Sequence, residues 1–141
     1  APITHKILNF ARPQFRYKIE TLIGKDSLDM TSKDRDLIYS RCKEADYCNI
    51  LITHGTDTMI DTAERLSDLS DRRIVLTGAS APGRFRDTDA DFNIGVAVGA
   101  IDSFRQVDIC GVYIAMNGRV FKWNRVSKGE DGMFYEKDSL T

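Results

Sequence analysis

The hydrophobic pattern of the chain alternates between short apolar runs and segments with helical spacing. Runs of aliphatic and β-branched residues at 49–53, 73–77 and 109–116 have the length and composition of buried strands. Between them, the segments 56–69 and 91–101 carry apolar residues at helical spacing or are rich in small residues, and both are predicted to be helices. Alternation of strands and helices requires a mostly parallel sheet. We therefore predict an α/β fold of three layers, with helices on both faces of the sheet.

The segments before the first buried run extend this plan toward the N-terminus. Residues 15–23 alternate apolar and polar side chains, which favours a half-buried strand. Thr31 followed by Asp34 resembles a capping box and predicts a helix that continues to about Ala45. The residues of this helix expected to face inward are Leu37, Ile38, Cys42 and Ala45.

The last part of the chain is predicted to be less regular. Asn117 and Gly118 form a hairpin-turn signal directly after the run at 109–116, and a short second arm is expected over 120–123. Beyond Lys122 the sequence becomes polar and contains glycines, which predicts a loop-rich tail. No internal repeat or low-complexity linker divides the 141 residues, so a single domain is expected.

Composition and charge exclude several classes of function. A hydrophobic content of 42%, a charged content of 29% and a net charge of −1 are ordinary for a soluble globular protein. No cluster of basic and aromatic residues predicts nucleic-acid binding, and no apolar run reaches the length of a membrane span. Cys42, Cys48 and Cys110 show no C-x-x-C spacing, so we expect reduced thiols in a cytoplasmic protein rather than a zinc site.

Residues 54–59, which read His-Gly-Thr-Asp-Thr-Met, form the candidate site, because they stand where a buried strand gives way to a helix. Ligands of open α/β sheets bind at this edge, and the helix start offers unpaired N–H groups to an anion. A purely structural interpretation also exists, with Thr56 as the helix N-cap and Asp57 as an acid of the first turn.

Two further residues near this site fit either a structural or a chemical role. His54, at the end of the strand, fits a supporting contact better than a general base. Lys128 has the sequence context of a surface lysine. If the fold returns it to Thr56, a desolvated amine could instead deprotonate the hydroxyl.

Other motifs argue against a nucleotide or metal cofactor. The loop at 78–83 contains glycines but matches neither the P-loop nor the dinucleotide fingerprint. Three alternating aspartates resemble the start of a calcium loop, but Phe92 and Val98 stand where that loop needs Gly and Glu. We therefore expect the acids to belong to a solvated loop. These aspartates are Asp87, Asp89 and Asp91.

The order of these segments resembles the N-terminal domain of bacterial-type L-asparaginases, a family that also contains glutaminase-asparaginases. The similarity covers about residues 15–130, and its most specific part is the family's second signature at 54–63. The resemblance implies a flavodoxin-like sheet and the hydrolysis of L-asparagine to L-aspartate and ammonia without metal or organic cofactor. The remaining matches lie at 26–31, at 75–79, at Asp89, Asn93 and Ala97, at 116–117 and at 126–128.

The resemblance also implies catalytic roles for three residues. Thr56, Asp57 and Lys128 correspond to the family's Thr-Lys-Asp set, in which the threonine attacks or activates water and the lysine helps to remove its proton. Backbone N–H groups would stabilise the oxyanion.

A second group of residues is implied to bind the substrate. Asp57 would hold the α-ammonium group, Ser27 the α-carboxylate, and the backbone carbonyl of Ala79 the side-chain amide. The same substrate-binding set includes Asp26 and Gly55. A small amino-acid amide is thus the expected partner, and we also expect a homo-oligomer.

Three departures from the family pattern shape the remaining expectations. The first signature, Thr-Gly-Gly-Thr-Ile on the opening strand, does not occur, and residue 1 falls in the segment that normally follows it. The smaller C-terminal domain has no counterpart, and residues 80–82 replace the usual arginine after Gly-Ala. We therefore expect residues 1–141 to form one short asparaginase N-terminal-type domain without its first strand. The native gene product is expected to carry that strand upstream of Ala1, where it would fill an unpaired slot in the sheet.

Two alternatives to an amidohydrolase remain open at this point. A catalytically silent amino-acid-binding module would retain Ser27 and Asp57 but lack the first threonine of the family. A flavodoxin-like nucleotide binder would share the fold alone. Preference for asparagine or glutamine also stays open.

Overall fold

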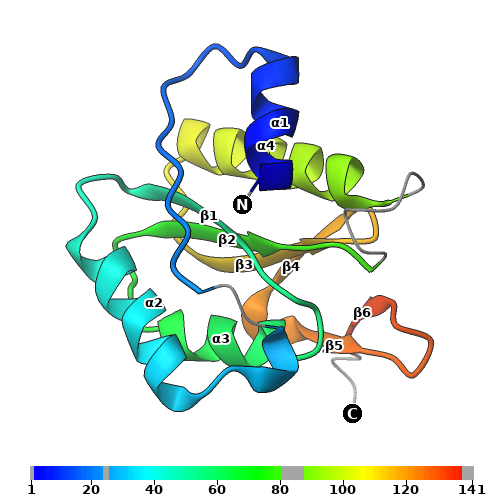
Figure 1. Cartoon of the computed structure of the whole chain (residues 1–141). Helices are drawn as coiled ribbons and strands as arrows, with labels where there is room; N and C mark the ends of the chain where they lie inside the picture. Colours follow the sequence, from blue (N-terminus) through cyan, green and yellow to red (C-terminus); the bar gives the residue numbers. More distant parts are fainter. Residues whose placement is uncertain (1, 24–25, 81–87, 138–141) are drawn as a thin grey trace.

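The computed structural model describes residues 2–23, 26–80 and 88–137, which form one main sheet between two layers of helices (Figure 1). No helix in this part of the chain is long and apolar enough to cross a membrane. The elements in chain order are α1 (Pro2–Ala11), η1 (Ser27–Asp29), α2 (Ser32–Glu44), β1 (Asn49–Thr53), α3 (Met59–Leu66), β2 (Arg73–Thr77), α4 (Ala90–Gln106), β3 (Gly111–Met116), β4 (Arg119–Lys122), η2 (Trp123–Arg125), β5 (Val126–Lys128) and β6 (Phe134–Glu136).

The main sheet has the strand order β1-β2-β3-β4. The first three strands are parallel and in register, with Thr53 opposite Thr77 and Thr77 opposite Ala115. The fourth strand is antiparallel to β3. The mostly parallel α/β fold predicted from the sequence is confirmed, and the C-terminal ends of β1, β2 and β3 meet at one edge.

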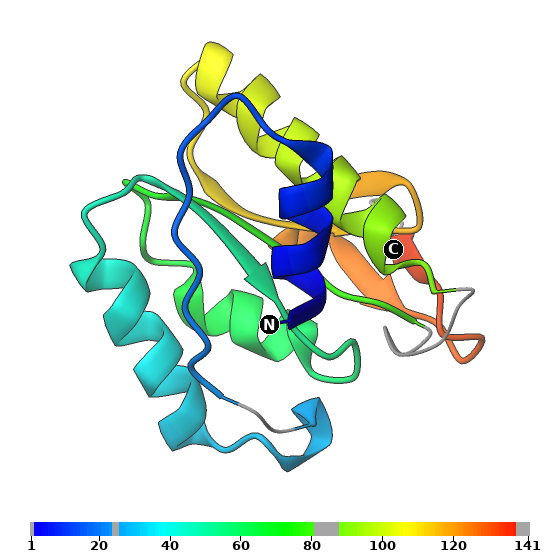
Figure 2. The same ribbon diagram turned by 45° about the horizontal axis from the view of Figure 1, so that its top comes forward.

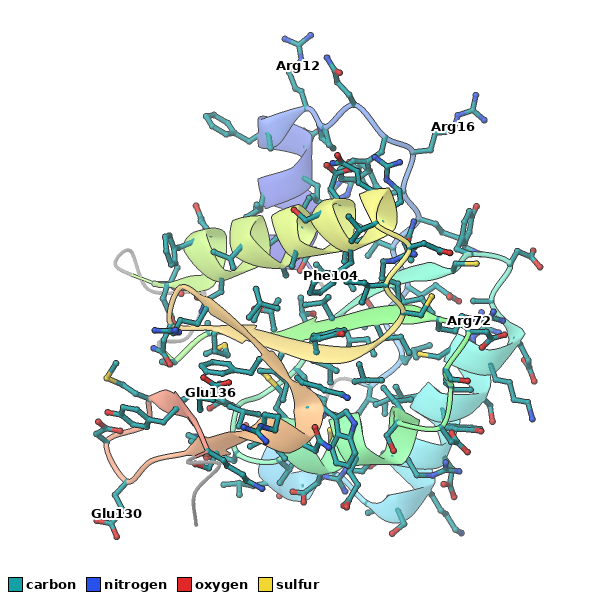
Figure 3. The ribbon with its side chains drawn as sticks, turned by 180° about the vertical axis from the view of Figure 1, so that it is seen from behind. Arg12, Arg16, Arg72, Phe104, Glu130 and Glu136 are labelled. Carbon is teal, nitrogen blue, oxygen red and sulfur yellow. The ribbon has the colours of Figure 1, made fainter. Side chains whose placement is uncertain are left out.

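Helices cover both faces of this sheet, as predicted (Figures 1 and 2). The larger core lies between the sheet and the α2–α3 layer, and it contains the fully buried Ile74 and Leu76 of β2. Val75 points to the opposite face, where it packs against Ala97 of α4 and Ala115 of β3. Because successive residues of a strand face opposite sides, one apolar strand contributes to both cores. Figure 3 shows Phe104 of α4 on this second face, where its ring lies 4.5 Å from that of Tyr113.

Two arginines fix the N-terminal edge of the sheet. Arg73 is buried, and its guanidinium donates to the carbonyl of Ile109 (2.7 Å) and to Asn49 Oδ1 (2.6 Å), which joins the starts of β1 and β3. Arg72 donates to three carbonyls at the end of α2, a favourable position for a cation (Figure 3). Hydrogen bonds from these two arginines to backbone carbonyls therefore hold the starts of the strands together. The loops of the candidate site lie at the opposite edge of the sheet.

The capping box at the start of α2 is confirmed. Thr31 Oγ1 accepts from the backbone N–H of Asp34 (3.3 Å), and the Asp34 carboxylate accepts from the backbone N–H of Thr31 (2.9 Å). Ile38 and Cys42 are buried as predicted, whereas Leu37 is 44% exposed. Burial raises the pKa of the Cys42 thiol to about 11, against the opposing effect of the nearby Arg72 cation.

The predicted strand at 15–23 is wrong. This segment has no regular structure, and the side chains of Phe15, Tyr17 and Leu22 are exposed. It runs from α1 to the α2 side of the molecule (Figure 2), where Glu20 pairs with Arg41. Alternation alone does not make a strand, because the backbone must also pair with a sheet edge, and this segment pairs with none of the described strands. The described strands β1, β2 and β3 are direct neighbours without a slot between them, and the outer edge of β1 pairs with no other described strand.

The predicted loop-rich tail is also wrong, because β5 and β6 form an antiparallel hairpin after β4. Val126 and Phe134 anchor this hairpin in the larger core, with exposed fractions of 1% and 3%. The backbone N–H of Phe134 donates to Asn117 Oδ1 at 2.7 Å. Asn117 itself belongs to the predicted two-residue turn between β3 and β4, where its φ of 54° and the 77° of Gly118 fit the left-handed geometry of such turns.

Candidate active site

The structure does not give Thr56 and Asp57 the helix-capping roles of the purely structural interpretation. Helix α3 begins at Met59, its N-cap residue is Thr58, and its first-turn acid is Asp61. Residues 54–58 instead form an irregular turn after β1. Thr56 and Asp57 therefore lie before the helix, at the C-terminal edge of the sheet, with side chains that do not cap it.

Lys128 contacts both residues, although it lies 72 positions after Thr56. Its Nζ atom donates to Thr56 Oγ1 at 2.9 Å and to the Asp57 carboxylate at 2.8 Å. The lysine side chain is 24% exposed and that of Asp57 is 46% exposed, so a small solute can reach this cluster from solvent. The β5–β6 hairpin positions Lys128 because β5 ends at this residue.

Ser27 lies against the other side of the same turn. It is 2% exposed, and its backbone carbonyl accepts from Thr58 Oγ1 at 2.8 Å. A Cβ atom on Gly55 would lie 2.7 Å from Ser27 Oγ, so glycine is required for this close approach. Among the described residues, Ser27 Oγ is a buried polar atom without a hydrogen-bond partner. Such atoms are rare in folded proteins, and this one is suited to a ligand group. Asp26, directly before it, is exposed.

The loop after β2 carries Ala79, which is half-buried. Asn93 of α4 is 1% exposed, and its Nδ2 donates to the carbonyl of Gly78 (2.8 Å) and to Asp89 Oδ2 (2.9 Å). The same Asp89 oxygen accepts from the backbone N–H of Ser80 at 3.0 Å. The first turn of α4 therefore fixes the backbone on both sides of Ala79. Sequence reasoning matched Asn93 and Asp89 to the family but did not find this function, for which the i, i+4 spacing was the available signal.

Asp89 thus anchors a loop instead of belonging to a solvated acidic segment, which corrects the expectation for this residue. Asp91 is exposed on α4, and Asp87 lies outside the described residues, as do residues 81–86. In the described part of the chain, no group of three or more His, Cys, Asp or Glu residues is arranged to hold a metal ion.

The loops after β1 and β2 contact each other at Gly78. A Cβ atom there would lie 2.2 Å from the carbonyl oxygen of His54 and 3.1 Å from Met59 Cε. Because the first of these neighbours is backbone, we expect Gly78→Ala to lower the free energy of unfolding by about 1–3 kcal/mol or more, as for an overpacked core. Urea denaturation measures this difference.

Gly95→Ala is the matched control for that prediction. Gly95 lies within α4, and nothing lies within 4 Å of a Cβ added there. In this control variant, the free energy of unfolding is expected to rise by about 0.5–1 kcal/mol, because alanine has a higher helix propensity than glycine. Equal stability of the Gly78→Ala variant and the parent would contradict the close approach of the two loops.

Comparisons with known proteins agree with this architecture. Residues 4–134 match the family model described as Asparaginase, N-terminal. The chain is 33% identical over 112 residues to a glutaminase-asparaginase of Acinetobacter glutaminasificans, covering 78% of this chain and 32% of that protein. It is 32% identical over 108 residues to L-asparaginase 1 of Escherichia coli K12, covering 73% of this chain and 31% of that protein.

A solved structure shows the same fold. The crystal structure of a probable cytoplasmic L-asparaginase from Campylobacter jejuni superposes with a TM-score of 0.81 and 25% sequence identity, over 96% of this chain and 45% of that one. The chain spans about a third of the length of the curated relatives it matches, at 32% and 31% for the two above. The family model nevertheless covers nearly all of it, so the chain belongs to the asparaginase family, whose N-terminal domain it matches.

Proposed function

We propose that this chain carries the site of an amidohydrolase that converts L-asparagine and water to L-aspartate and ammonia. The observation that carries the proposal is the double contact of Lys128 Nζ, 2.9 Å from the Thr56 hydroxyl and 2.8 Å from the Asp57 carboxylate. An amide carbonyl is a poor electrophile, so its hydrolysis needs an activated nucleophile, a proton acceptor and support for the oxyanion. The names of the relatives, L-asparaginase and glutaminase-asparaginase, point to the same reaction class.

Thr56 and Lys128 would perform the proton transfers. The Thr56 hydroxyl, or a water molecule that it activates, attacks the side-chain amide carbon, and the proton passes to Lys128 Nζ once that nitrogen is neutral. The same proton then leaves on the departing ammonia when the tetrahedral intermediate collapses. Where Thr56 is the attacking group, this leaves an acyl ester on its oxygen, and a water molecule that gives its proton to Lys128 Nζ attacks that ester, releasing L-aspartate and restoring the Thr56 hydroxyl. A substrate ammonium at Asp57 would compete with Lys128 for the carboxylate and so free the amine for its contact with Thr56.

The other residues of the site would hold the amino acid in place. Asp57 binds the α-ammonium group, and the unpartnered Ser27 hydroxyl binds the α-carboxylate. The backbone carbonyl of Ala79 accepts from the side-chain amide, within the loop that Asn93 fixes. Asp26 and Gly55 flank these groups, Gly55 by allowing Ser27 to approach the turn.

We expect Asp57→Asn to act mainly on substrate binding. The change keeps the shape of the side chain and removes the charge that pairs with an ammonium group, which costs about 2 kcal/mol or more, or roughly a 30-fold weaker affinity. Calorimetric titration with L-aspartate measures it. Asp61→Asn is the control, because Asp61 is an exposed acid in the first turn of α3. Equal affinities of the two variants would contradict the role of Asp57.

We further propose that the catalytically complete protein carries one more strand, on the outer edge of β1. This edge pairs with no described strand, and the alternating segment 15–23 lies outside the sheet although its pattern suits a strand. A strand inserted there would have β1 on one side and offer the segment 15–23 an edge on the other. Its C-terminal end would reach the edge of the sheet where Thr56 lies.

Ammonia release from L-asparagine tests the proposed activity, with L-glutamine as the second substrate. If the protein with the proposed additional strand binds L-aspartate but releases no ammonia, it is the silent amino-acid-binding module. A thermal shift with nucleotides and none with L-aspartate would indicate the nucleotide binder instead.

We also propose that the protein is located in the cytoplasm and forms a homo-oligomer. The similarity to a probable cytoplasmic L-asparaginase from Campylobacter jejuni supports the location, whereas a relative from Haemophilus influenzae is named as a probable periplasmic L-asparaginase. Sedimentation equilibrium tests the oligomeric state.

A further inference from the structure

The imidazole of His54 lies within a continuous series of hydrogen bonds. Its Nδ1 atom is 2.7 Å from the carbonyl oxygen of Gly55, and its Nε2 atom is 2.7 Å from Thr62 Oγ1. Thr62 is fully buried in α3, and its oxygen also accepts from Nε of Arg35 in α2 at 3.1 Å. The series therefore begins at the partly buried Arg35 and ends at the residue directly before Thr56.

The chemistry of each atom fixes where the protons are. A carbonyl oxygen can only accept, so Nδ1 of His54 must carry the hydrogen in its contact with Gly55. Arg35 Nε–H can only donate, so Thr62 Oγ1 accepts from it. The Thr62 hydroxyl then has its own hydrogen available for Nε2 of His54. All three contacts are satisfied together when His54 is neutral and protonated on Nδ1.

We propose that Arg35 and Thr62 are positioning residues that keep Nε2 of His54 unprotonated, while the Gly55 carbonyl holds the hydrogen on Nδ1, and that the neutral His54 thereby orients the turn presenting Thr56 and Asp57. The backbone N–H of His54 donates to the carbonyl of Thr77 at 2.9 Å, so the residue is tied to β2 as well. Consequences for turnover rest on the proposed function. The tautomer itself is a property of the folded chain and can be measured without a substrate.

Protonation of His54 breaks this arrangement. A second N–H would face Thr62 Oγ1, whose hydroxyl hydrogen would have to leave the contact, and the imidazolium would lie near the Arg35 cation. Burial is the main cause that lowers the pKa of His54 below its ordinary value; the hydrogen bond to Gly55 opposes it, Arg35 lowers the pKa further and Asp61 of α3 raises it. As pH falls below about 6.5, the unfolded chain binds a proton that the native chain does not, so this group lowers stability toward acid.

Nitrogen NMR of the whole chain labelled with ¹⁵N-histidine tests the proposal directly. The sequence contains two histidines, and His5, an exposed residue of α1, is the internal reference. At pH 7.5 we expect His54 to show a protonated Nδ1 and an unprotonated Nε2, whereas His5 shows the mixture typical of a solvated imidazole. On titration, the midpoint of His54 is expected below the ordinary value of a histidine side chain. A protonated Nε2 in His54 at pH 7.5 would overturn the proposal.

Substitutions of the positioning residues separate this role from a merely structural one. Arg35→Met removes a nearby cation and leaves the Thr62 hydroxyl free to accept from Nε2–H, so the imidazolium should form more easily and the titration midpoint of His54 should rise, while the Gly55 carbonyl still favours the hydrogen on Nδ1. Thr62→Ser keeps the hydroxyl and should retain the tautomer and the titration midpoint of the parent. The control is Arg65→Met, because Arg65 pairs with Asp36 and lies over the ring of Tyr39.

Arg35→Met is decisive even if a variant of the buried Thr62 fails to fold, because Arg35 is only partly buried. A folded Arg35→Met protein in which His54 keeps the titration midpoint of the parent would refute the role of Arg35. If the parent shows the Nδ1–H form and the protein with the proposed additional strand releases no ammonia, the inference stands and the proposed function fails. If ammonia is released but His54 is a mixture of tautomers, the proposed function stands and the inference about His54 fails.

Discussion

Thr56→Val is expected to lower the rate of L-asparagine hydrolysis by about three to four orders of magnitude, the usual cost of removing a member of a catalytic unit. Valine keeps the shape of the side chain but removes the hydroxyl that Lys128 Nζ contacts at 2.9 Å. Ammonia release measured on the protein with its proposed additional strand provides the test. The variant should retain its affinity for L-aspartate, because Asp57 and Ser27 are unchanged.

Two controls make this result interpretable. Thr56→Ser keeps the hydroxyl and should retain most of the activity, which separates the chemistry from packing. Urea denaturation should show a folded valine variant, since Thr56 lies before the helix and caps none of its N–H groups. A folded Thr56→Val protein that hydrolyses asparagine at the parental rate would assign Thr56 a role in the turn alone.

A strand added upstream of Ala1 and ending in a Thr-Gly-Gly turn is expected to raise hydrolysis by a similar factor over the 141-residue chain, about three to four orders of magnitude. The added strand would supply both a partner for the outer edge of β1 and a second threonine at the same edge of the sheet. Ammonia release from the two proteins, compared at equal concentration and verified by intact mass, measures the effect.

A control protein carries the same added strand with valine in place of the threonine in its turn. It separates the effect of the strand on stability from the effect of the threonine hydroxyl on activity. This variant should gain stability toward urea, because the sheet edge is covered, but little activity. Full activity from a protein whose intact mass is 15.9 kDa would contradict the need for an additional strand. Thr56 would then be the remaining candidate for the nucleophile.

The parts of the fold that could be predicted are those encoded locally. The strands at 49–53 and 73–77 have the predicted bounds because turn-forming residues flank each apolar run. The segment 15–23 has an equally clear pattern but forms no strand, because alternation does not specify which edge a segment pairs with, and this one pairs with none of the described strands. The β5–β6 hairpin was missed because each strand has three residues, too few for periodicity. It depends on distant contacts made by Val126 and Phe134.

The site was predictable only in part for the same reason. The residue types at the end of a predicted strand identified Thr56 and Asp57. The apolar spacing predicts a helix that starts three residues too early, because the spacing of apolar residues does not locate the N-cap. No local pattern connects Lys128 to Thr56 across 72 positions, and the resemblance to a family supplied that pairing. The contact of Arg35 with Thr62 joins residues 27 positions apart on different helices, and nothing in the sequence marked it.

The separate sheet formed by β5 and β6 makes the two halves of the site differ in local stability. Short hairpins open with smaller free energies than the strands of a central sheet, so this one can unfold while β1, β2 and β3 remain intact. Each opening removes Lys128 from Thr56 but leaves Asp57 and Ser27 in place. Mild heating or low denaturant should therefore abolish turnover before it abolishes ligand affinity, with amide hydrogens of the hairpin exchanging first.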